Sequence, residues 1–182
     1  MRADIVPRAI FPRSSISVED KRERLRRRYC PERIRLLFIG ESPPASGRFF
    51  YRQDSGLYRA IRDTFRMIDP SITDDTFLEV FRNSGCYLID ACSRPVDRLD
   101  ARSRHAACLA GEPGLTRNIR RLKPSAIATL VKSIRDNVRR AAGEARWRGP
   151  ILELPYPGRW ASHREVFHEG LVPRLQQLMS ER

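Results

Sequence analysis

Residues 35–40 read Arg-Leu-Leu-Phe-Ile-Gly, a short apolar run that ends at a glycine. No polar residue interrupts the four apolar ones, which is typical of a strand buried on both faces of a sheet. Three later runs have the same character, so we expect four strands in all. The later runs are residues 86–91, 126–131 and 150–154.

The stretches between these runs repeat apolar residues at helical spacing, as Leu57, Ile61, Phe65 and Ile68 do. Pro173 lies inside the last such stretch and is expected to break or kink it. Strands that alternate with helices predict one α/β domain, an α/β/α sandwich around a central, mostly parallel, four-stranded sheet. We expect helices over residues 57–68, 74–81, 100–110, 115–122, 133–143 and 162–179.

The first thirty residues differ in character from the rest. Residues 1–16 show little periodicity, and Ser17 can cap a helix that continues through a basic stretch at 21–29. That stretch is either a phosphate-contacting arm or a solvated surface helix. We therefore divide the chain into a basic N-terminal extension, residues 1–30, and an α/β domain, residues 31–182.

The chain of 182 residues carries 35 Lys and Arg against 22 Asp and Glu, a formal net charge of +13. An excess of this size indicates a polyanionic partner, most simply nucleic acid, although a solvated Arg-rich surface has the same composition. No apolar run reaches the roughly 18 residues of a membrane span, and no secretory signal begins the chain. We expect a cytoplasmic monomer that does not bind membranes.

In a parallel sheet, ligands bind beyond the carboxyl ends of the strands. The loop after the first expected strand, residues 40–51, reads Gly-Glu-Ser-Pro-Pro-Ala-Ser-Gly-Arg-Phe-Phe-Tyr. It places the Glu41 carboxylate next to the strand end, with three aromatic residues close behind. Rings beside a fixed carboxylate suit a base flipped out of DNA, but a capping Glu followed by core aromatics gives the same pattern. The other loops at this edge are residues 90–98, 131–134 and 154–163.

Four segments, in order along the chain, resemble motifs of the uracil-DNA glycosylase superfamily. Residues 37–44, Leu-Phe-Ile-Gly-Glu-Ser-Pro-Pro, resemble the first motif and are closest to the Gly-Glu-Ala-Pro-Gly form of the iron–sulfur families. The resemblance implies an enzyme that removes uracil from DNA and leaves an abasic site. Residues 87–90 with Arg94-Pro95 resemble the second motif. Residues 121–124 resemble the family's entry to the third strand. Residues 154–158 lie where the family has its His-Pro-Ser motif.

The resemblance assigns roles to residues of this chain. Glu41 is expected to position the water that attacks the sugar C1′ and to stabilise an oxocarbenium-like transition state. Phe49 or Phe50 is expected to stack on the flipped uracil, and backbone N–H groups from Gly40 to Ser42 to bind one of its oxygens. The expected substrate-binding residues are Gly40, Ser42, Phe49, Phe50 and Tyr51. The expected DNA-binding residues are Pro155, Tyr156, Pro157, Gly158, Arg159 and Trp160. Of these, Arg159 and Trp160 are the candidates to fill the gap that the flipped base leaves.

Two motif positions depart from the family pattern. Asp90 stands where the family has its base-reading Asn, and we expect it to be a second catalytic carboxylate or else a strand-end cap. Leu154 stands where the family has a His that stabilises negative charge on the leaving uracil, and this loss would raise the barrier by roughly a few kcal/mol unless another donor substitutes. His163 is either that donor or a surface residue. The expected catalytic residues are Glu41, Asp90 and His163.

The cysteines do not match the ligand set of the iron–sulfur families. Cys108 lies near a family ligand position, but Ser93 precedes Arg94-Pro95, and Cys30 is the one cysteine upstream of the first expected strand. A cluster needs four thiolates. We therefore expect free thiols, no iron–sulfur cluster, no other metal and no cofactor.

The leading hypothesis is a cofactor-free uracil-DNA glycosylase whose partner is DNA that contains uracil. One alternative is a superfamily member that binds uracil-containing or abasic DNA with little or no catalysis. Another is a basic α/β protein that binds RNA or DNA. A further alternative, an α/β enzyme acting on a nucleotide or phosphorylated small molecule, is disfavoured because no GxGxxG or GxxxxGK[ST] fingerprint is present.

Overall fold

The computed structural model describes residues 17–158 and 160–180, so the expectations for residues 1–16 and for Arg159 lie outside the described residues. Within these ranges four strands form one sheet in the order β2-β1-β3-β4, and every neighbouring pair is parallel. The predicted α/β fold around a four-stranded sheet is confirmed. The strands are β1 (Leu36–Gly40), β2 (Cys86–Asp90), β3 (Ala126–Thr129) and β4 (Ile151–Glu153).

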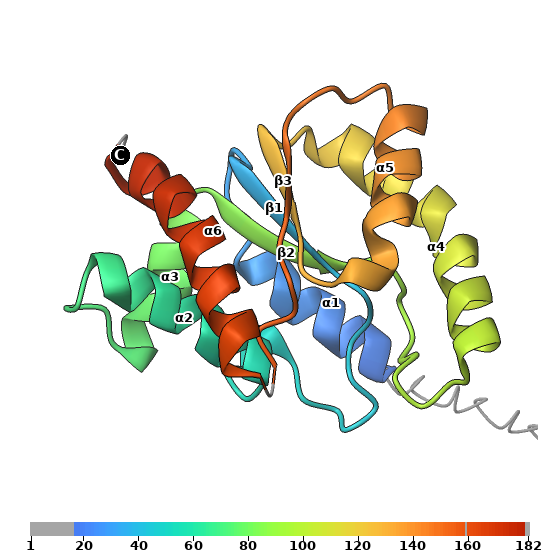
Figure 1. Cartoon of the computed structure of the whole chain (residues 1–182), viewed down its shortest axis with the longest axis horizontal. Helices are drawn as coiled ribbons and strands as arrows, with labels where there is room; N and C mark the ends of the chain where they lie inside the picture. Colours follow the sequence, from blue (N-terminus) through green and yellow to red (C-terminus); the bar gives the residue numbers. More distant parts are fainter. Residues whose placement is uncertain (1–16, 159, 181–182) are drawn as a thin grey trace, which may run out of the picture.

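Helices cover both faces of this sheet. They are α1 (Val18–Arg28), α2 (Gly56–Ile68), α3 (Asp74–Asn83), α4 (Ala101–Leu122), α5 (Arg135–Glu144) and α6 (Ala161–Ser180), with two short 3-10 helices, η1 (Phe50–Arg52) and η2 (Lys132–Ile134). Figure 1 shows α4 and α5 on one side of the sheet and α2, α3 and α6 on the other, which gives the three layers of a sandwich. All five residues of β1 are buried, as its uninterrupted apolar run predicts.

Two expectations about helix boundaries differ from the structure. Residues 100–110 and 115–122 are not separate helices but parts of α4, which also contains Pro113, and Pro173 does not break α6. A proline inside a helix removes one N–H donor and leaves one carbonyl without its partner. Both prolines are exposed, so water can hydrogen bond to that carbonyl. Packing of the opposite, buried face of each helix then outweighs the local cost.

A glycine brings α4 close to the end of β2. A Cβ atom on Gly111 would lie 2.5 Å from the carbonyl oxygen of Ala91, which belongs to the backbone just beyond the strand. No side chain fits at that distance, so glycine is required for this approach. The first half of α4 is thereby held beside the carboxyl edge of the sheet.

Helix α1 packs on the domain. The side chain of Ser17 accepts a hydrogen bond from the backbone of Asp20, as expected of a cap. At the other end of the helix, the ring of Tyr29 stacks on Tyr51, with 5.6 Å between ring centroids and 13° between planes. Arg26 donates a hydrogen bond to the carboxylate of Asp90 at the end of β2. The basic helix therefore reaches the carboxyl edge of the sheet.

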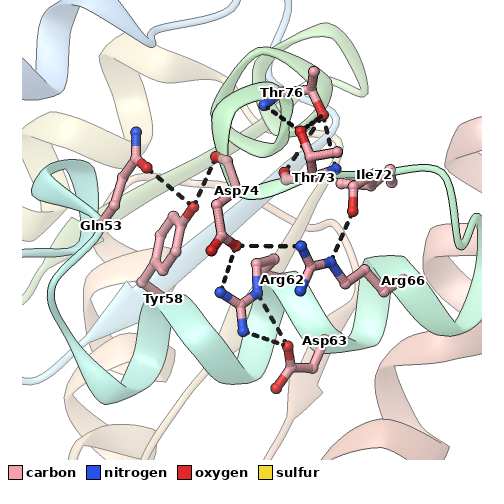
Figure 2. Close-up of polar contacts among 9 residues, drawn as sticks. All are labelled: Gln53, Tyr58, Arg62, Asp63, Arg66, Ile72, Thr73, Asp74 and Thr76. Carbon is pink, nitrogen blue, oxygen red and sulfur yellow. Dashed lines mark hydrogen bonds and ion pairs between the residues drawn. The ribbon is translucent and has the colours of Figure 1, made fainter.

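A polar junction ties α2 to α3, as Figure 2 shows. Arg62 and Arg66 both donate to the carboxylate of Asp74, and Arg66 also donates to the carbonyl of Ile72. The Tyr58 hydroxyl lies 3.1 Å from the Asp74 carbonyl oxygen. The ring of Tyr58 packs edge-on against Phe50, with 5.8 Å between centroids. The junction thus supports Phe50, one of the aromatic residues at the end of the loop that follows β1.

The register of the sheet places the strand ends side by side. Gly40 lies opposite Asp90, and Thr129 lies opposite Glu153. Loops that leave these ends therefore meet at one edge. None of the described helices is both long and apolar enough to cross a membrane.

Candidate active site

A pocket of about 390 Å³ opens at the carboxyl edge of the sheet. It lies against the loop that leaves β1 and also touches the end of β2 and the residues after β3. Four of the five expected substrate-binding residues line it, and Tyr51 does not. The lining residues that matter below are Gly40, Glu41, Phe49, Phe50, Asp90 and Arg104.

Glu41 forms the floor of this pocket and its side chain is 9% exposed. Its Oε1 atom accepts hydrogen bonds from Nε of Arg104 and from the hydroxyl of Ser133, each at 2.8 Å. Nη2 of Arg104 forms an ion pair with the other oxygen, Oε2. The two carboxylate oxygens are therefore held from α4 and from η2. Such a carboxylate is oriented before any ligand arrives.

Sequence reasoning missed both partners of Glu41. Ser133 belongs to one of the loops expected at this edge, so its position could have been anticipated from the strand pattern. Arg104 lies in a helix, 63 residues from Glu41 along the chain, and no motif contains it. Its hydrogen bond to Glu41 raises the pKa of the Arg104 guanidinium above the ordinary arginine value. Arg104 therefore remains a cation in the pocket.

Asp90 also lines the pocket, and its Oδ2 atom accepts a hydrogen bond of 2.9 Å from Nη2 of Arg26. Burial raises the pKa of Asp90 above the ordinary value, although the charges of Arg26 and Arg22 oppose this shift. Oδ1 lies against the backbone of Gly40, where an added Cβ would be 2.9 Å away. The structure places this carboxyl group at the second strand end, where the sequence motif predicts it.

The raised pKa of Asp90 gives a prediction for stability. The folded state holds a proton that the unfolded chain releases, so the stability of the native protein falls as pH rises from about 4, the ordinary pKa of Asp. Asp90→Asn removes this titration. We expect the free energy of unfolding of the native protein, relative to that of the variant, to decrease over this pH range. Urea unfolding at several pH values gives the free energy of unfolding of the native protein and of Asp90→Asn. A native value that rises with pH relative to that of the variant would contradict the prediction.

The three consecutive aromatics have different surroundings. Phe49 and Phe50 line the pocket, although both are almost fully buried. The guanidinium of Arg26 lies over the Phe49 ring, 5.5 Å from its centroid. Phe50 packs on core rings such as Phe81, with 5.2 Å between centroids. The sequence left open whether these rings bind a base or belong to the core. Phe49 and Phe50 do both in part, because each lines the pocket and is also packed in the core.

Tyr51 forms hydrogen bonds with the outer edge of the sheet. Its hydroxyl donates to the carbonyl of Leu88 at 3.0 Å and accepts from the Leu88 N–H at 2.8 Å. Leu88 lies on β2, an outer strand of the sheet, so these two backbone groups face away from β1, and no strand among the described residues pairs with them. The hydroxyl takes the place of such a strand.

The last loop contributes less to the pocket than its motif predicts. Tyr156 lines the pocket and is 46% exposed, while Leu154 is buried and does not line it. Trp160 is 68% exposed. His163 is exposed in the first turn of α6 and is not among the pocket residues. Of the remaining expected residues, Pro155, Pro157 and Gly158 form the connection from β4.

The thiols of Cys92 and Cys108 lie close together. The Sγ atoms of Cys92 and Cys108 are 3.6 Å apart, and both residues are buried. Burial raises the pKa of the Cys92 thiol to about 12. Two thiols do not supply the four ligands of an iron–sulfur cluster, and the described part of the chain brings no three His, Cys, Asp or Glu side chains together for a metal. The residues present therefore do not fit the cluster of the iron–sulfur families.

A comparison with family models supports the resemblance seen in the motifs. Residues 27–172 match the model of the uracil DNA glycosylase superfamily. The match spans most of the chain and includes every strand, so the chain belongs to this superfamily. A search of curated proteins finds no significant match.

Proposed function

We propose that this protein is a DNA glycosylase that hydrolyses the N-glycosidic bond of uracil in DNA. The observation that carries the proposal is the buried carboxylate of Glu41 on the floor of a pocket that Phe49 and Phe50 help to line. The volume of about 390 Å³ lies in the range of roughly 300–1,000 Å³ of small-ligand pockets. A nucleotide extruded from the helix would bring its base and C1′ into such a space.

The chemistry requires a water molecule and a positive charge that develops on the sugar. Glu41 accepts a hydrogen bond from the water and directs it to C1′ as the bond to N1 breaks. Its negative charge stabilises the oxocarbenium-like sugar. Ser133 and Arg104 hold the carboxylate in place beforehand, so little reorganisation is needed at the moment of reaction.

The charge and the exposed rings near the pocket support DNA as the substrate. The net charge of +13 favours a polyanion. Tyr156 lies at the pocket and Trp160 follows a few residues later, both with exposed rings. Rings in such a position can enter the minor groove or the gap that a flipped base leaves.

The direct test is incubation with single- and double-stranded oligonucleotides that contain one uracil, followed by alkaline cleavage. We expect strand scission at the uracil, and none in the same sequence with thymine at that position. Free uracil in the supernatant, detected by chromatography, checks that the base is released intact. Absence of scission with excess protein would overturn the proposal.

A protein that binds uracil-containing or abasic DNA without cleaving it is the second candidate. Two observations favour it: Leu154 offers no polar group at the motif position, and both oxygens of Glu41 already have partners. Tight binding that weakens steeply with salt, with no release of base, would support this candidate over the first.

A further inference from the structure

The pocket contains a cation beside its catalytic carboxylate. Arg104 lines the pocket, and its side chain is 41% exposed. The edge of the guanidinium formed by Nε and Nη2 faces Glu41. Nη1, on the other edge, forms no hydrogen bond within the described ranges, so it can donate to a ligand. The ion pair with Glu41 fixes where this free edge lies.

Breaking a glycosidic bond creates two charges of opposite sign next to each other. The sugar becomes positive at C1′, and the electron pair of the C1′–N1 bond makes the base negative at N1 and at its O2 oxygen. Glu41 and Arg104 present a negative and a positive group side by side in the same pocket. We propose that Arg104 is a catalytic residue whose guanidinium stabilises the departing uracil anion while Glu41 stabilises the sugar. This inference rests on the proposed function and adds the group that handles the leaving base.

The position of Arg104 suits this role because O2 is bonded to the carbon next to N1. A donor in contact with the carboxylate that faces C1′ is therefore within reach of O2. Charge-assisted hydrogen bonds of this kind are stronger than neutral ones. The reaction stays balanced: the oxygen of water forms the new bond to C1′, Glu41 takes one of its protons, and the base anion acquires a proton from Glu41 or from solvent.

Other groups are less suited to the leaving base. His163 is exposed and does not line the pocket, and Leu154 is apolar. The hydroxyl of Ser133 already donates its hydrogen bond to Glu41. Arg48 lines the pocket, but it is exposed, and no ion pair holds it within the described residues. Arg104 combines a permanent charge with a fixed position.

The test compares two leaving groups in single-turnover reactions. One oligonucleotide carries uracil and the other carries 5-fluorouracil, whose anion is more stable and needs less help from the protein. We expect Arg104→Ala to slow release of uracil by about 100-fold, the size of a single lost donor to a developing anion. The reduction in the rate of 5-fluorouracil release should be roughly tenfold smaller, because a less basic leaving group needs less stabilisation of its negative charge. Arg104→Lys, which keeps the charge, should recover part of the rate on uracil.

The matched control is Arg102→Ala, an exposed arginine of the same helical turn that does not line the pocket. It removes the same charge and should leave both rates close to those of the native protein. Equal losses on the two substrates in Arg104→Ala would mean that Arg104 acts through Glu41 alone and would overturn the inference. Unchanged rates would overturn it as well. Thermal melting of the variants checks that each is folded.

A binding measurement separates this inference from the proposed function. Free 5-fluorouracil becomes an anion at mildly alkaline pH, and titration calorimetry measures its affinity for the protein as pH is raised. We expect tighter binding of the anion to the native protein and loss of this preference in Arg104→Ala. If no base is released from either oligonucleotide, the proposed function fails, and this measurement alone decides the inference. No preference for the anion in the native protein would then overturn it.

Discussion

Replacing Glu41 with Gln is expected to slow uracil release by about 1,000-fold while DNA binding stays close to native. Gln has nearly the same shape, and its amide oxygen can still accept from Nε of Arg104 and from Ser133, so only the ion pair with Nη2 of Arg104 is lost. The negative charge is lost, however, and with it the ability to take a proton from water and to stabilise a positive sugar. Single-turnover rates and binding of uracil-containing DNA, measured on the same preparations, give the two quantities.

Glu112→Gln is the matched control for this variant. Glu112 is also a glutamate paired with an arginine, since it accepts from Arg140 and from the side chain of Asn137, but it does not line the pocket. Its replacement should leave the rate of uracil release nearly unchanged. A rate for Glu41→Gln within a factor of about three of native would remove Glu41 from the mechanism; a factor of three is about 0.7 kcal/mol, too small for a catalytic carboxylate.

Replacing Tyr51 with Phe is expected to lower the free energy of unfolding by about 2–6 kcal/mol. The change removes one oxygen atom and keeps the ring, so the stack on Tyr29 and the packing with neighbouring rings remain. The N–H and carbonyl of Leu88 lose their shared partner in a buried position. Each unsatisfied buried group costs about 1–3 kcal/mol. Urea unfolding followed by circular dichroism gives the difference.

Tyr156→Phe provides the comparison for Tyr51→Phe. The side chain of Tyr156 is half-exposed, so water can hydrogen bond to any polar group that loses contact with its hydroxyl. We expect a change in unfolding free energy within about 0.5 kcal/mol. If Tyr51→Phe were equally mild, the hydroxyl would not be the partner on which the edge of β2 depends, and a role for Tyr51 in the pocket would become the better reading.

Local patterns predicted the strands well because each residue of a buried strand must itself be apolar, so burial is visible in the sequence of the strand alone. The apolar run at residues 35–39 became β1, and the carboxylate that follows it lies at the strand end as expected. The expected break at Pro173 did not occur, because a propensity describes the isolated helix. Pro113 and Pro173 lie on exposed faces, where packing on the opposite face holds the helix together.

The partners of the expected site residues could not be predicted in the same way. Glu41 meets Arg104 and Ser133 from 63 and 92 residues away. Asp90 meets Arg26 across 64 residues, from the helix that sequence alone assigned to a separate extension. Contacts between elements so far apart depend on how the helices pack on the sheet, and periodicity carries no information about that.

The sequence by itself determined the parallel α/β fold, the superfamily, and the place of Glu41 and Asp90 at adjacent strand ends. These features follow from short-range patterns, namely apolar runs, the residues that stop them, and motifs a few residues long. The tertiary structure decided which aromatic residues face the pocket, that Tyr51 completes the sheet, and that Arg104 lies beside Glu41. Those outcomes depend on side chains that meet only when the layers pack, because a charge or a hydroxyl has its effect over a few ångströms in space, whatever the separation along the chain.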